Sequence, residues 1–460
     1  MKSVKLSLIA ALVAGSFSTL NAKSLEEAIK NVDVSGFVYY RYDSGRFTAN
    51  TLGKDGRVQR GYNLDAGGIP YPQTHRYRAE LGTKVDAGNG FKVFGQLLYS
   101  NNNHSFKDGA NYNQGADTKQ PIYLKQAYLE YQNADYGYSF KWGRQNLNTI
   151  WTDDLAGMAA EAFYSPTEGF TLAAFAVDSF ESGDDEANFE YILGNRLYDG
   201  TTGQPSATAL DKPTAEALNK RLYKYNLYGA AILTDFAGLK TEFWGAYWQH
   251  TANLWAVKLD YTLPLGEDAS YRLHANYYGN TVDNYFKKNL INADNGQLFN
   301  LKGEIKIASL DANLGGIMFG KEKKYTINTL EDAPGNDGDL YIGSEIFYQR
   351  GSWTVLSQGK NTYGYFGAGY TLPSNLRVGI KGVYGGTKIG SGSASFDANN
   401  GGGQKMEGVA EISWKYNAGL SFLTYYSYLS TKAKGGINAT NKEDAKSVKN
   451  TVRFQAKYTF

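Results

Sequence analysis

The chain consists largely of segments in which apolar and polar side chains alternate residue by residue. In residues 32–43 the even positions carry valine, glycine and tyrosine, whereas the odd positions include Asp33 and Arg41. In residues 299–307, Leu301 and Ile305 alternate with polar residues such as Lys302. Alternation over this length is typical of β-strands that have one apolar and one polar face. We therefore predict an all-β fold.

The connections between these segments alternate in length. Short turns and long polar stretches follow one another, as in bacterial outer-membrane barrels with short periplasmic turns and long extracellular loops. The short turns are expected at Asp86–Gly90, Asn133–Asp135, Ser165–Gly169, Thr234–Gly238, Pro264–Asp268, Pro373–Asn375 and Asn417–Gly419. The long connections are expected at about 44–72, 101–119, 145–156, 179–221, 281–296, 321–338, 387–404 and 431–446.

A soluble β-sandwich is the alternative, because it also has one apolar and one polar face per strand. However, aromatic residues gather near segment ends, as at Tyr136, Tyr138 and Trp142, which is typical of the aromatic girdles at two membrane interfaces. We therefore predict a closed transmembrane antiparallel β-barrel. The strand count is 18 to 20 and should be even, depending on whether Trp353–Gln358 is a strand. A barrel of this size leaves a water-filled lumen.

The N-terminus indicates export. Lys2 and Lys5 precede an apolar run from Leu6 to Leu20, which is typical of a signal peptide over residues 1–22, with cleavage near Ala22. Residues 23–460 would then form one barrel domain in the outer membrane, in contact with its lipid and lipopolysaccharide. The first strand begins near Val32, which leaves no room for a globular plug.

The C-terminal segment has the same alternation and ends in an aromatic residue. Tyr458 and the terminal Phe460 lie on its apolar face, whereas Lys457 and Thr459 lie on its polar face. This ending resembles the signal that the barrel-assembly machinery reads in outer-membrane proteins. An ordinary last strand of a soluble β protein is the alternative.

Composition and motifs exclude several classes of function. The chain has no cysteine, four histidines without a metal-ligand spacing, and neither a GxSxG nor a P-loop motif. The net charge of +2 comes from scattered residues, so nucleic acid is not an expected partner. We predict no enzymatic activity and no required cofactor. A surface adhesin and a barrel hydrolase remain the alternatives to a channel.

Four stretches resemble one family, the major outer membrane porins of Campylobacter and relatives. They are MKSVKLSLIAALVAGSFS at the start, LEEAIKNVDVSGFVYYRYD, QAYLEY and WGRQNLNTIWTD. The resemblance implies an 18-stranded homotrimeric general-diffusion porin for ions and small hydrophilic solutes, with one loop folded into the channel and a weak preference for cations.

The third long connection is the candidate constriction. Its sequence from Asn146 to Ala156 contains Leu147, Ile150 and Trp151, which are out of place in a loop surrounded by water. If these three side chains anchor the loop inside the barrel wall, Asp153 and Asp154 face the channel. The alternative is that Trp151 belongs to the upper aromatic girdle and both aspartates are exposed outside.

Alternation also predicts which basic side chains point into the lumen. Arg41, Arg76, Arg78 and Lys141 are expected on the inner wall, where they would face the acidic loop and create a transverse field. Two adjacent carboxylates, Asp153 and Asp154, could also hold a divalent cation such as Ca²⁺, which prefers oxygen ligands.

Overall fold

The computed structural model describes residues 32–52, 58–62, 74–104, 121–152, 154–180, 226–289, 293–331, 354–388, 403–433 and 445–460. The predicted signal peptide, residues 1–22, and Asp153 lie outside these ranges. Within them, no helix is long and apolar enough to cross a bilayer.

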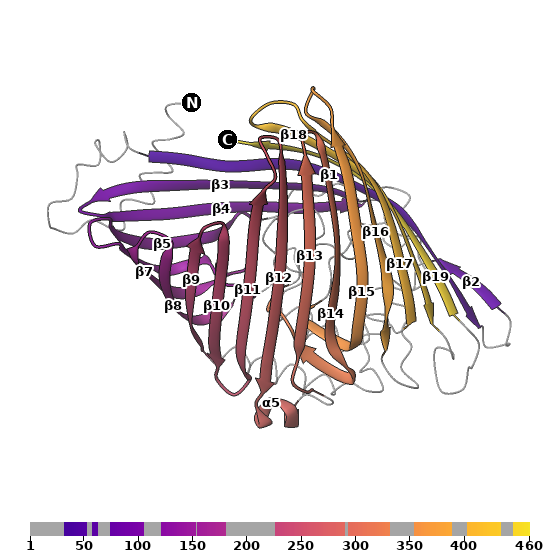
Figure 1. Ribbon diagram of the computed structural model, residues 1–460, viewed down its shortest axis with the longest axis horizontal. Helices are drawn as coiled ribbons and strands as arrows, with labels where there is room; N and C mark the ends of the chain where they lie inside the picture. The colour runs from indigo at the N-terminus through magenta and orange to yellow at the C-terminus, as the bar shows by residue number, and fades with distance from the viewer. Residues whose placement is uncertain are drawn as a thin grey trace.

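Nearly all of the described residues are in antiparallel β-strands. The strands are β1 (Val32–Leu52), β2 (Val58–Tyr62), β3 (Thr74–Gly88), β4 (Phe91–His104), β5 (Tyr123–Asn133), β6 (Tyr138–Asn146), β7 (Ala156–Thr167), β8 (Phe170–Phe180), β9 (Leu227–Phe236), β10 (Leu239–Trp248), β11 (Ala252–Pro264), β12 (Ala269–Val282), β13 (Gln297–Ile307), β14 (Leu310–Ile327), β15 (Leu356–Thr371), β16 (Leu376–Lys388), β17 (Gly403–Lys415), β18 (Leu420–Ala433) and β19 (Ala445–Thr459). The helix α5 (Asn284–Asn289) lies beyond the strand ends, away from the C-terminus (Figure 1).

The sheet closes on itself. β1 pairs with β3 along one edge, over residues 32–43, and with β19 along its other edge, over residues 37–49, so the first and last barrel strands meet. Reciprocal backbone hydrogen bonds of 3.0 Å between Gly36 and Phe460 complete this seam. Of the nineteen strands in the described part of the chain, β2 pairs with the outer end of β1, and the other eighteen form the barrel (Figure 1). The predicted 18-stranded antiparallel barrel is thus confirmed, and Gln358 belongs to β15.

Short turns join the strands at one end of the barrel, as the sequence predicts. Asn89 and Gly90 form a two-residue turn with φ values of 53° and 83°. This geometry matches the right-handed twist of the flanking strands. The sequence reasoning missed one short turn, at Ala308–Ser309, because it carries neither Gly nor Pro. At the opposite end, β10 and β11 are joined by only three residues, Gln249–Thr251.

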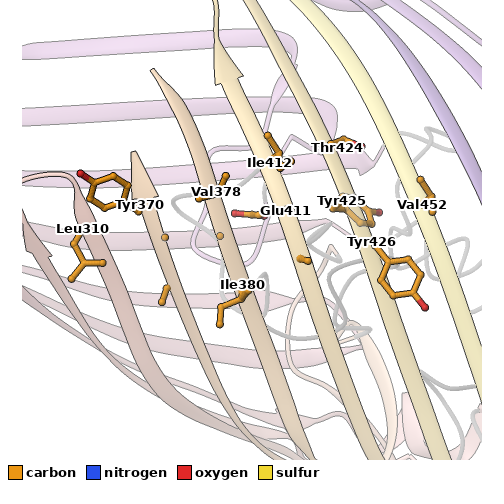
Figure 2. Close-up of a pocket in the computed structure, with 14 residues that line it drawn as sticks. Leu310, Tyr370, Val378, Ile380, Glu411, Ile412, Thr424, Tyr425, Tyr426 and Val452 are labelled. Atoms are coloured by element: carbon orange, nitrogen blue, oxygen red, sulfur yellow. The ribbon is translucent and has the colours of Figure 1, made fainter. Parts of the chain in front are cut away.

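The alternation of the sequence separates the two faces of the barrel wall. Tyr39 and Arg41 are buried on the inner face of β1, whereas Val38 is half exposed on the outer face. Outer side chains such as Trp142 meet the bilayer, where apolar surface is favoured. The outer wall is not smooth. An apolar hollow of about 670 Å³ lies across β14–β19. Figure 2 shows some of the side chains that line it, such as Ile380 and Tyr426.

Candidate functional site

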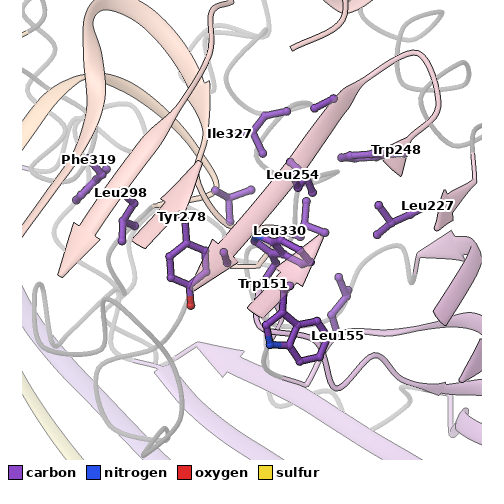
Figure 3. Packing of buried hydrophobic residues seen from close by; sticks show 14 of the residues in the cluster. Trp151, Leu155, Leu227, Trp248, Leu254, Tyr278, Leu298, Phe319, Ile327 and Leu330 are labelled. Atoms are coloured by element: carbon purple, nitrogen blue, oxygen red, sulfur yellow. The ribbon is translucent and has the colours of Figure 1, made fainter. Parts of the chain in front are cut away.

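The connection between β6 and β7 folds into the lumen, as predicted for one loop. Leu147 and Trp151 are each 1% exposed, and Leu155 is buried beside them. These side chains join an apolar cluster on the inner wall, most of whose members lie on β8–β14 (Figure 3). The Trp151 ring packs edge-on against Trp244, with 6.1 Å between ring centroids. Ile150 is partly buried against the same cluster.

Hydrogen bonds within this inward loop, residues 147–155, fix its shape. The Leu147 amide donates to the Leu155 carbonyl at 2.8 Å, which closes the base of the loop. The hydroxyls of Thr149 and Thr152 lie 2.9 Å apart, and the Thr152 hydroxyl also donates to the Leu147 carbonyl. Because the buried polar groups are paired within the loop, the loop can leave water for the apolar wall.

The part of the barrel wall formed by β10–β14, called the far wall below, holds the loop at its tip. The Tyr278 hydroxyl of β12 donates to the Ile150 carbonyl at 3.1 Å. Beyond β14, the amides of Leu330 and Glu331 donate to the Trp151 carbonyl at 2.9 and 3.3 Å. The Glu331 carboxylate in turn accepts the Leu155 amide at 3.0 Å.

The segment 328–331 is therefore a second inward element, which the sequence reasoning missed. It lay within a stretch, 321–338, that was expected to be a long outer connection. Leu330 is fully buried, and the Thr329 hydroxyl lies 2.8 Å from that of Thr354. Apolar Ile327 and Leu330 in a polar stretch are the same kind of signal that drew attention to the first inward loop.

The part of the wall formed by β1 and β3–β5 is called the near wall below. Here Asp154 contacts two cations, Lys125 and Arg78. Its Oδ2 accepts Lys125 Nζ at 2.9 Å and lies 3.5 Å from Arg78 Nη2. Glu80 lies between the same two cations, with its Oε1 at 2.7 Å from Arg78 Nη2 and 3.2 Å from Lys125 Nζ. The Asp154 side chain is 33% exposed, whereas that of Lys125 is only 2% exposed. The basic wall and the acidic loop are thus in direct contact at Asp154.

This environment determines the charge of Asp154. Burial raises the pKa of its carboxyl, but the positive charges of Lys125 and Arg78 outweigh burial and lower the pKa to about 2. The carboxylate is therefore ionised at any physiological pH.

Lys125 reaches Asp154 because of an irregularity in the sheet. The register of β4 and β5 shifts between Gln96 and Leu97, so that Lys125 is the extra residue of a β-bulge. The Arg144 Nε donates to the carbonyls of Leu124 and Lys125 at 3.1 and 2.9 Å. Strict alternation would turn Lys125 outward, which is why the sequence reasoning did not select it.

Arg41 and Arg76 lie on the same near wall, as register partners of β1 and β3. Their guanidinium carbons lie 5.0 and 6.0 Å from the centroid of the Tyr39 ring. The Arg41 Nε also donates to Gln455 at 2.9 Å, across the barrel seam. With Arg78 and Lys125 they form a patch of positive charge beside the inward loop.

Lys141 is on the inner face too, but nearer the short turn that precedes β6. Its register partners are Glu130 and Glu161, and its Nζ lies 5.8 Å from the Tyr128 ring and 5.9 Å from the Phe163 ring. These contacts are with the wall rather than with the inward loop.

The calcium prediction stays a prediction. Asp153 lies outside the described residues, and the Asp154 carboxylate is already in contact with the cations Lys125 and Arg78. Among the described residues, no group of three or more His, Asp or Glu side chains is arranged to hold a metal ion.

Tyr458 and Phe460 lie at the end of β19 with their rings stacked at 6.1 Å and about half exposed. Several other charged groups of the lumen form ion pairs along the wall. Arg453 pairs with Asp43 at 2.6 Å, and Arg377 pairs with Asp311 at 2.6 Å.

Comparisons with known proteins agree with this architecture. The family described as Campylobacter major outer membrane protein matches residues 1–460. No curated protein matches the chain. Among solved structures, OccAB4 of Acinetobacter baumannii is similar with a TM-score of 0.57 at 12% identity, over 93% of this chain and 98% of that one. OpdK of Pseudomonas aeruginosa, solved with vanillate, has a TM-score of 0.56 at 11% identity, over 93% and 98% of the two chains. At such identities the likeness concerns the fold alone.

Proposed function

Because the chain belongs to the Campylobacter major outer membrane protein family, we propose that it is a general-diffusion porin for ions and small hydrophilic solutes. It is an outer-membrane β-barrel of porin type, and a porin needs no covalent chemistry. It provides a water-filled path whose narrowest part selects by radius and by local charge.

The observation that carries this proposal is the inward loop, held at both sides of the lumen. Trp151 and Leu155 attach it to the far wall, and Asp154 attaches it to Lys125 and Arg78 on the near wall. We propose that a loop held in this way narrows the lumen to a fixed cross-section without closing it. We propose that Asp153, Asp154, Arg41, Arg76 and Arg78 line this constriction.

We further propose a weak cation preference, which the family resemblance implies. The acids that would support it are Asp153 and Asp154. The basic patch of Arg41, Arg76, Arg78 and Lys125 opposes it, so the preference would be small. The same carboxylates are the proposed ligands of a Ca²⁺ ion.

The assembly of the protein is part of the proposal. The chain would lose residues 1–22 on export, would be inserted by the barrel-assembly machinery through its Tyr458 and Phe460 ending, and would form a homotrimer in contact with lipopolysaccharide. Cross-linking in mild detergent tests the trimer, and a monomer alone would contradict it.

Planar-bilayer conductance tests the porin function directly. Detergent-extracted protein that shows the heat-dependent gel mobility of a folded barrel should form open, long-lived channels. An adhesin or a barrel hydrolase with a filled lumen would give the same gel shift but no conductance. Absence of channels in a folded preparation would therefore reject the proposal.

A further inference from the structure

Two lysines face each other on the outer wall at one rim of the barrel. Lys360 of β15 and Lys388 of β16 are register partners, and both are exposed. Neither belongs to an ion pair within the described part of the chain. Like charges directly opposite in an antiparallel pair are destabilising, so this position favours an anion between the two ammonium groups.

The rim that carries these lysines is the extracellular one. Lys360 lies near the start of β15 and Lys388 at the end of β16, beside the long connections 328–355 and 389–402. Long connections are extracellular in barrels of this type, and short turns are periplasmic. The lysine pair therefore lies at the outer leaflet of the outer membrane.

On the same outer wall, an apolar groove of about 960 Å³ extends across β12–β14 and reaches Thr362 of β15. Gly316 lines it, and the register partner of Gly316 on β15 is Gly364, so the wall has no side chain at either of these neighbouring positions. Leu314, which is 71% exposed, and Met318 border it. Met318 pairs with Thr362, and Lys360 is the next outward residue of β15 above Thr362.

The groove and the lysine pair together match one kind of molecule. Acyl chains fill an apolar groove in a barrel wall, and phosphate groups pair with lysines at the membrane surface. We propose that this face binds the phosphorylated glycolipid of the outer leaflet, lipopolysaccharide, with acyl chains over Gly316 and Gly364 and a phosphate between Lys360 and Lys388. A second copy of the chain would instead have to bring carboxylates to the lysine pair.

The first test measures lipid affinity. Delipidated full-length protein is titrated with bisphosphorylated lipopolysaccharide and, separately, with the same lipid after removal of its phosphates. We expect Lys360→Gln with Lys388→Gln to weaken binding of the bisphosphorylated lipid by roughly tenfold or more. The dephosphorylated lipid should bind wild type and this variant equally. Excess inorganic phosphate should not displace the lipid, since it has no acyl chains.

A matched control carries the same charge change at the periplasmic rim. Lys240→Gln with Lys415→Gln removes two exposed lysines there and should leave the affinity unchanged. If both double variants bind the bisphosphorylated lipid equally more weakly than wild type, or if both bind it as tightly as wild type, the proposal is overturned. Only preparations that show the heat-dependent gel shift of a folded barrel are compared. The single variant Lys388→Gln should also weaken binding of the bisphosphorylated lipid, but less than the double variant does.

Two further variants test the groove. Gly316→Val with Gly364→Val fills its floor and keeps both lysines, and an added Cβ at these positions would come no closer than 3.5 Å to its neighbours. We expect weaker lipid binding, and unchanged binding would contradict the groove. Leu314→Cys would be the only thiol of the chain. Disulfide-linked copies through this cysteine would show that a second copy covers the groove and would overturn the lipid assignment.

Discussion

Lys125 Nζ lies 2.9 Å from Asp154 Oδ2, although Lys125 occupies a strand position that alternation would turn toward the lipid. A β-bulge in β5 turns Lys125 into the lumen instead, and its ion pair with Asp154 links the barrel wall to the inward loop. Lys125 is almost fully buried, so loss of the contact would leave the Lys125 ammonium without its main partner in a place that water hardly reaches, and the Asp154 carboxylate would lose its main partner too.

We expect Lys125→Met to loosen the inward loop. Asp154 would lose its 2.9 Å partner and keep its 3.5 Å contact with Arg78, and Glu80 would lose one of its two cations. The free energy of unfolding should fall by about 1–3 kcal/mol, and single-channel current should become noisier. Urea titration in lipid vesicles and bilayer recordings measure the two effects. Lys240→Met, a change at a mostly exposed side chain, is the control and should alter neither.

Removal of the loop charge should shift ion selectivity toward anions. Asp154→Asn deletes a negative charge and leaves Lys125 and Arg78 in place. A unit charge a few ångströms away is worth roughly 1–4 kcal/mol near a protein surface, so the cation-to-anion permeability ratio should fall severalfold. Reversal potentials under a salt gradient measure this ratio.

The same recordings on Asp153→Asn with Asp154→Asn test both aspartates of the loop. Asp235→Asn, at an exposed site near a short turn, should leave the ratio unchanged. A double variant that matches wild type would show that these carboxylates do not line the constriction.

The loop contact should resist acid down to about pH 4. The pKa of Asp154 is lowered from the ordinary 3.8 to about 2 in the folded protein. A lowered carboxyl pKa stabilises the folded state above the unfolded value, and this stabilisation is lost as the pH falls from about 4 toward 2. The charge of Asp154 in a folded, open channel follows the folded-state pKa, so conductance recorded from pH 7 to pH 3 should keep its Asp154-dependent component. A change between pH 5 and 7 that is absent in Asp154→Asn would contradict this.

Trp151→Ala should detach the loop tip from the far wall. The side chain is fully buried against Trp244, and truncation of a buried aromatic costs about 3–5 kcal/mol of folding free energy. We expect lower thermal stability and a larger, more variable channel conductance. Trp142→Ala, which truncates a 63% exposed outer tryptophan, should leave the conductance unchanged. Equal conductance in wild type and Trp151→Ala would mean that the loop keeps its place without this anchor.

Much of the fold follows from the sequence because its causes are local. Alternation assigns Arg41 and Arg78 to the inner face and Val38 to the outer face, and the structure has them there. Turn residues such as Asn89 and Gly90 mark the short connections. Apolar Leu147 and Trp151 within a polar connection indicate a loop that leaves water. Each of these signals is carried by the residue and its immediate neighbours.

The remaining features depend on how distant segments meet. The bulge at Lys125 is a register shift between β4 and β5, and no local pattern in the sequence of β5 predicts it. Glu331 reaches the Leu155 amide across 176 positions of sequence, and Lys360 meets Lys388 only because β15 and β16 pair in one particular register. The sequence by itself determined the barrel, its two faces and the loop that enters the lumen. Only the tertiary structure decided which charges meet, because pairing between strands depends on the register of the closed sheet.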